Sequence, residues 1–192
     1  MVVLILGLVI FLASHSVRIF APAWRISMIA RLGEGPWKGL YSLVSLVALL
    51  LIVWGYGLSR LDPVVIWDPP VWTRHIAVLL NLIAFILLAL FIVPSGRLKA
   101  RLGHPMVLGV KVWAFAHLLS NGTLADLLLF GSLLVWAIVD YAASRRRDRA
   151  EGRVYVAGPA RNDAIAVILG VVLWAALLWR VHEWVIGVHP IA

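Results

Sequence analysis

The six histidines are the residues through which this chain could do metal, redox or proton chemistry, because it contains no cysteine. Imidazole is a common axial ligand of haem iron, and it titrates close to neutral pH. His15 and His117 lie within apolar stretches, where an ionisable side chain usually marks a working site. Of the other four, we expect His75, His182 and His189 outside the membrane core, at the ends of apolar stretches or beyond them. His104 is expected at a helix start. No phosphate loop, serine triad or paired-carboxylate motif is present.

Two histidines that share one iron must come from different helices. His104 and His117 lie on one predicted helix, about 20 Å apart along its axis, and their side chains point roughly 140° apart. The residues alone therefore allow an inner pair, His15 with His104, or an outer pair of His117 with His75 or His182. His104 precedes a proline, so it can alternatively cap a helix start.

Long apolar helices must position these histidines. Hydrophobic residues make up 63% of the chain, more than the core of a water-soluble domain of 192 residues can absorb. The sequence predicts an all-α, polytopic transmembrane helical bundle forming a single domain over 1–192. A spanning helix needs about 20 apolar residues, and the six candidate spans are about 2–20, 38–58, 72–93, 105–120, 123–143 and 162–186. Asp126 suits the start of the fifth helix, because a carboxylate is favoured at the positive end of the helix dipole.

The basic residues predict how the chain is oriented. Fourteen of the 17 lie in or beside the first, third and fifth connectors, and only Arg60, Arg74 and Arg180 lie on the other side. The positive-inside rule therefore predicts that the first, third and fifth connectors are cytoplasmic and that both termini are outside. The net charge of +8 is explained by this orientation and by anionic lipid headgroups, so the lipid bilayer is the expected partner and nucleic acid is not. The longest connector is predicted at about 144–161.

Three motifs resemble the NnrU family, which comprises small bacterial membrane proteins associated with denitrification and nitric-oxide metabolism. They are Ser14-His15-Ser16, Gly103-His104-Pro105-Met106 and the run from Trp113 through His117 to Gly122. The resemblance covers nearly the whole chain and implies a multi-pass protein of the bacterial inner membrane. That family is in turn similar to the plastid 15-cis-ζ-carotene isomerase, a b-type haem membrane enzyme that also has a cysteine shortly before its second haem ligand. Here that region holds Ala114, Phe115 and Ala116.

The resemblance implies that haem b is bound by His15 and His117. Counted from the span ends, these two residues differ in depth by about 5–10 Å, which a tilted helix or haem would absorb. His104 is the substitute ligand if that offset is not absorbed. The implied function is a redox or gas-responsive haem protein of nitrogen-oxide metabolism. The alternative is an enzyme, a haem-dependent cis–trans isomerase of a lipid-soluble polyene. A third class is a small-solute transporter or an assembly partner without cofactor.

Overall fold

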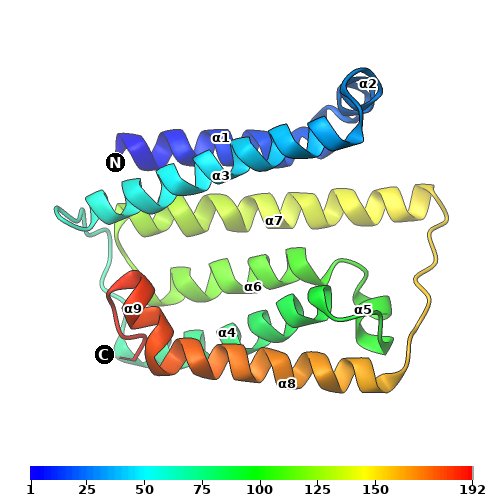
Figure 1. Cartoon of the computed structure of the whole chain (residues 1–192). Helices are drawn as coiled ribbons and strands as arrows, with labels where there is room; N and C mark the ends of the chain where they lie inside the picture. The colour runs from blue at the N-terminus through cyan, green and yellow to red at the C-terminus, as the bar shows by residue number, and fades with distance from the viewer. Residues whose placement is uncertain (192) are drawn as a thin grey trace. The chain divides into compact units, whose positions relative to one another are not determined.

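The computed structural model describes residues 1–191, which are helical apart from the connectors and one isolated antiparallel bridge between Val65 and Thr123. The chain forms two compact units. Unit 1 comprises Met1–Trp67 and Thr123–Ser132, and unit 2 comprises Asp68–Gly122 and the chain from Leu133 onward. In chain order (Figure 1) the helices are α1 (Val2–Phe20), α2 (Pro22–Leu32), α3 (Glu34–Ser59), α4 (Val71–Ile92), α5 (Arg97–Leu102), α6 (Pro105–Ser120), α7 (Leu124–Ala150), α8 (Ala160–Ala176), a π-helical segment (Leu177–Val181) and α9 (His182–Ile186).

Five of the predicted apolar stretches form helices long and apolar enough to cross a membrane. They are α1, α3, α4, α7 and the continuous helical run Ala160–Ile186. The remaining stretch forms α6 with the predicted bounds, but α6 has only 16 residues. At 1.5 Å per residue it is about 24 Å long, less than the hydrocarbon thickness of about 30 Å. The described residues therefore form an all-helical protein of the membrane type, with five long candidate spans and one shorter apolar helix.

The connectors contain more helix than the sequence predicts. The first includes α2 and the third includes α5. The predicted connector at about 144–161 is wrong at its N-terminal end, because α7 continues to Ala150, whereas its C-terminal end agrees within two residues with the start of α8 at Ala160. Arg145 and Asp148 lie three residues apart on α7 and form an ion pair, which favours helix in this charged run. Ala192, the predicted outward C-terminus, lies outside the described residues.

In unit 1, small residues bring α1 and α3 close together, and Figure 1 shows these two helices side by side. A Cβ atom added to Gly55 would lie 2.6 Å from Leu4 Cα, and one added to Gly7 would lie 2.7 Å from Ile52 N. Such close approach of two backbones is how helices gain packing energy in lipid, where burial of apolar surface gives no advantage. Leu4 is fully buried as a result.

The first turns of α7 belong to unit 1 and are fixed there by polar contacts. Leu124 N donates to Val64 O at 2.8 Å, next to the bridge between Val65 and Thr123. Asp126 is buried, and its Oδ2 accepts hydrogen bonds from Thr123 N at 2.9 Å and Thr123 Oγ1 at 2.6 Å. Tyr56 Oη donates to Asp126 Oδ1 at 2.5 Å. The predicted place of Asp126 at a helix start is confirmed.

In unit 2, α4 packs against both α6 and α8. A Cβ atom added to Gly109 of α6 would lie 3.2 Å from Ala84 O, and one added to Gly170 of α8 would lie 2.6 Å from Ile86 Cα. Trp174 Nε1 of α8 donates to Val78 O of α4 at 3.0 Å. The core between these helices contains Ala89, Leu90, Val93 and Ala166.

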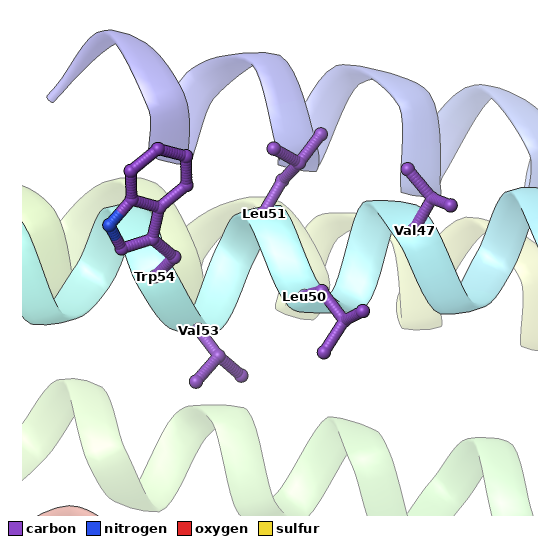
Figure 2. A pocket seen from close by; sticks show the side chains of 5 residues that line it. All are labelled: Val47, Leu50, Leu51, Val53 and Trp54. Carbon is purple, nitrogen blue, oxygen red and sulfur yellow. The ribbon is translucent and has the colours of Figure 1, made fainter.

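Large apolar side chains remain exposed along the long helices. Figure 2 shows one such region on α3, an open hollow of about 430 Å³ lined by Val47, Leu50, Leu51, Val53 and Trp54. Leu50, Val53 and Trp54 are each about 60% exposed. Continuous apolar exposure of this kind would be unfavourable in water and is compatible with a lipid bilayer.

Candidate functional sites

His15 lies in the last two turns of α1 and is half-buried. Its Nδ1 lies 2.8 Å from the carbonyl oxygen of Phe11, and its ring stacks on the Phe11 ring with centroids 3.9 Å apart. Because a carbonyl oxygen can only accept, this hydrogen bond requires the proton on Nδ1. The Nε2 atom of neutral His15 then carries the lone pair, which is the form that binds a metal.

His117 lies in the last turn of α6 and has the same local arrangement. Its Nδ1 lies 2.8 Å from the carbonyl oxygen of Trp113, four residues earlier, and the two rings have centroids 4.8 Å apart. Asn121 Nδ2 donates to the carbonyl oxygen of His117 at 2.8 Å, which holds the end of the helix. His117 is half-buried, and Nε2 again carries the lone pair in the neutral ring.

The two predicted haem ligands belong to different compact units, so each is characterised within its own unit. His15 is in unit 1 and His117 is in unit 2. Within residues 1–191, no group of three or more His, Asp and Glu side chains could hold a metal ion.

His104 has a different environment, on the other end of α6. It is the N-cap residue before Pro105, which is one of the two alternatives that the sequence allows, although its side chain makes no capping hydrogen bond. Its Nε2 instead lies 2.8 Å from Asp148 Oδ2. A carboxylate accepts, so Nε2 is the donor in this contact. In His104 it is therefore Nε2, and not Nδ1, that is shown donating to an acceptor.

Asp148 is the centre of a polar network in unit 2. Tyr155 Oη donates to Asp148 Oδ2 at 3.0 Å and lies 3.2 Å from His104 Nε2, and Arg145 Nη1 lies 3.6 Å from the same carboxylate oxygen. Asp148 is only 6% exposed, so these partners replace the water that an ionised carboxylate requires. Burial raises the pKa of Tyr155, and the hydrogen bond to Asp148 raises that pKa further. The Tyr155 hydroxyl therefore stays protonated and donates.

The same network holds the connector between α7 and α8 against the rest of unit 2. Gly103 has φ +76°, which favours glycine, and a Cβ atom there would lie 3.0 Å from Arg145 Nη1 and 3.2 Å from Tyr155 Cε2. Further along the connector, Ser95 Oγ donates to Val156 O at 3.1 Å. The cluster thus brings together the start of α6, the end of α7 and the connector.

The remaining histidines lie where a surface role is expected. His75 is exposed near the start of α4. His182 Nδ1 lies 2.7 Å from Val188 O, and Arg180 and Glu183 form a surface ion pair beside it at 3.9 Å. His189 Nδ1 accepts a hydrogen bond from Ile191 N at 3.4 Å.

Sequence reasoning missed Asp148, Tyr155 and Tyr56 as partners. Asp148 lies in an arginine-rich run whose composition is typical of a solvated connector. Tyr155 lies in a polar segment whose apolar residues show no helical periodicity. The one available signal was Asp148 itself, the single acid among the arginines of 145–149.

A comparison with protein families covers almost the whole chain. The model described as NnrU protein matches residues 3–190. The chain belongs to the NnrU family. No curated protein and no solved structure matches this NnrU-family chain. The resemblance inferred from the three motifs is confirmed, and the motifs lie in α1 and around α6.

Proposed function

We propose that this NnrU-family protein is an integral protein of the bacterial inner membrane that binds haem b through Nε2 of His15 and Nε2 of His117. The observation that supports the proposal is that both imidazole rings make the same kind of hydrogen bond to their own helix. Each Nδ1 donates to the carbonyl oxygen four residues earlier, at 2.8 Å in both cases. Histidines that bind metals almost always donate their other ring nitrogen to a carbonyl or carboxylate, which fixes the tautomer and the ring orientation.

The donor chemistry fits haem b. Two neutral imidazoles are an ordinary axial pair for haem iron, and both residues lie in apolar helices that can exclude water. The fit is poorer for His104, because its Nε2 donates to Asp148 at 2.8 Å. His15 and His117 are therefore the preferred ligands, and His104 is assigned to the polar network instead.

In this proposal the protein contributes the position and basicity of the two imidazoles. The Phe11 ring stacked on His15 and the Trp113 ring beside His117 restrict rotation of the two side chains. Haem held in this way supplies one-electron redox chemistry, or a binding position for a small gas such as nitric oxide when one ligand is released. Together with the family's association with denitrification, this favours a redox or gas-responsive role in nitrogen-oxide metabolism.

Optical spectra of the detergent-purified, full-length protein test the proposal. We expect a Soret band in protein expressed with sufficient haem, and we expect His15→Ala and His117→Ala each to lose or shift it. Added imidazole should restore part of the band, which separates loss of a ligand from misfolding. His75→Ala and His104→Ala are the matched controls and should keep the spectrum. Haem-free wild-type protein, or loss of haem in His104→Ala alone, would overturn the assignment.

The isomerase alternative makes a separate prediction. An isomerase should convert ζ-carotene when its haem is reduced, whereas a redox or gas-responsive protein should not. Product analysis with the reduced, haem-loaded protein therefore distinguishes the two functions. Conversion that disappears in His117→Ala would replace the proposed function by the isomerase.

We further propose six spans with both termini outside. The distribution of basic residues supports this orientation. Although α6 is short, it packs on α4, and Val107, Gly109, Ala114 and Ala116 are buried, so a large part of its surface needs no lipid. Reporter fusions after Tyr155 and at Ala192 test the arrangement. The fusion after Tyr155 should report cytoplasm and the fusion at Ala192 the outside, and a cytoplasmic C-terminus would contradict the proposal.

A further inference from the structure

An open hollow of about 640 Å³ lies on the last turns of α7, within unit 2. It combines an apolar part with a basic part. Ile138, Val139, Tyr141 and Ala142 line the apolar part, and Arg145, Arg146 and Arg149 line the basic part.

These residues form one face of the helix. At about 100° per residue, the lining residues between 138 and 149 fall within roughly 160° of the helix circumference. Ala143, Ser144 and Asp148 are buried and lie on the remaining part of the circumference. Ala142 and Arg149 are seven residues apart, so the apolar and basic parts follow one another over about 10 Å along the axis.

The basic part carries an excess of positive charge. Of the three lining arginines, only Arg145 forms an ion pair within the described residues, and its Nη1 lies 3.6 Å from the Asp148 oxygen that also binds His104 and Tyr155. Within residues 1–191, Arg146 and Arg149 form no ion pair, and both are exposed. Among the residues that the structure describes, no acidic side chain lines the hollow. Arginine guanidinium groups in this arrangement match the geometry and charge of a phosphate.

We propose that this hollow binds one anionic phospholipid of the surrounding leaflet. The phosphate contacts Arg146 and Arg149, and an acyl chain lies along Ile138, Val139 and Ala142. A free phosphate ion would use only the basic part, whereas a phospholipid uses both parts in the order in which α7 presents them. The inference is independent of haem binding, because none of the residues involved is a proposed haem ligand.

Native mass spectrometry of the full-length protein in detergent tests this inference, with phosphatidylglycerol and phosphatidylcholine as probes. We expect wild-type protein to retain one phosphatidylglycerol in preference to phosphatidylcholine. An arginine near a membrane surface contributes about fivefold to anionic lipid binding, the factor that corresponds to about 1 kcal/mol. Arg146→Gln with Arg149→Gln should therefore reduce the preference by about 25-fold, while Ala142→Phe should reduce it without a change of charge.

Arg25→Gln with Arg31→Gln is the matched control, because it removes two arginines of α2, which do not line the hollow. This variant should keep the preference for phosphatidylglycerol. Size-exclusion profiles and unfolding midpoints check that all variants are folded. Three outcomes would each overturn the proposal. The control variant could lose the preference to the same extent, wild-type protein could retain the two lipids equally, or inorganic phosphate could displace phosphatidylglycerol.

Discussion

Replacing Asp148 by asparagine tests whether the polar network stabilises unit 2. The carboxylate accepts hydrogen bonds from His104 at 2.8 Å and from Tyr155 at 3.0 Å. A hydrogen bond to a charged group contributes about 1.5–3 kcal/mol, and one to a neutral oxygen contributes about half as much. Two such bonds weakened by half correspond to a loss of about 1.5–3 kcal/mol. For a chain of this size, the unfolding midpoint should fall by about 3–12 °C.

Thermal unfolding in detergent, followed by circular dichroism, measures this shift. Glu151→Gln is the matched control, because Glu151 is about half exposed and its ion pair with Arg153 is 3.9 Å long. An exposed ion pair of this length contributes little to the free energy of unfolding, so the unfolding midpoint of Glu151→Gln should differ from that of wild type by less than about 2 °C. Trypsin should also cleave at Arg153 faster in Asp148→Asn, since the connector loses the contact through Tyr155. Equal midpoints for the two variants, with unchanged cleavage, would refute the reasoning.

Three further predictions concern packing, protonation and helix capping. Gly170→Ala should lower the free energy of unfolding, measured with a chemical denaturant, by about 1–3 kcal/mol, because the new Cβ atom would lie 2.6 Å from Ile86 Cα. Gly57→Ala is the control and should cause no such loss, because a Cβ atom there has no other atom within 4 Å. Tyr155→Phe should reduce the loss of stability at alkaline pH. The raised pKa of Tyr155 means that the folded protein binds the proton more tightly than the unfolded chain, so wild-type stability falls as the pH rises above about 10. A smaller fall in wild type than in the variant would contradict this. Asp126→Asn should lower the unfolding midpoint, because Tyr56 and Thr123 lose a charged acceptor; an unchanged midpoint would contradict the capping role.

Helix positions were predictable because a membrane imposes a simple requirement of length and apolarity. The bounds 2–20 and 105–120 agree with α1 and α6. Helix continuing beyond the apolar core was not predictable from the same signal. At the end of α7, the ion pair between Arg145 and Asp148 stabilises helix in a segment that hydropathy assigns to a connector. Helix α2 was missed because its mixed composition is too polar for a span.

The candidate sites were predictable only in part. The histidines could be found because ionisable residues are rare in apolar helices, but the state of each ring depends on its partners. For His15 and His117 that partner is a carbonyl four residues away, which any helix supplies. For His104 it is Asp148, 44 residues later, and nothing in the sequence pattern links the two positions. The family resemblance indicated the preferred pair, and local hydrogen bonding now gives a physical reason to separate His104 from it.

The interleaved order of the two units has a consequence for biosynthesis. Unit 1 requires the first turns of α7, where Asp126 receives a hydrogen bond from Tyr56, 70 residues earlier in the chain. Translation must therefore pass Ser132 before the N-terminal half can finish assembling, although α1 and α3 have long since left the ribosome. By then, α4, α5 and α6 have also been made, so the nascent chain completes its two units in overlapping fashion rather than one after the other.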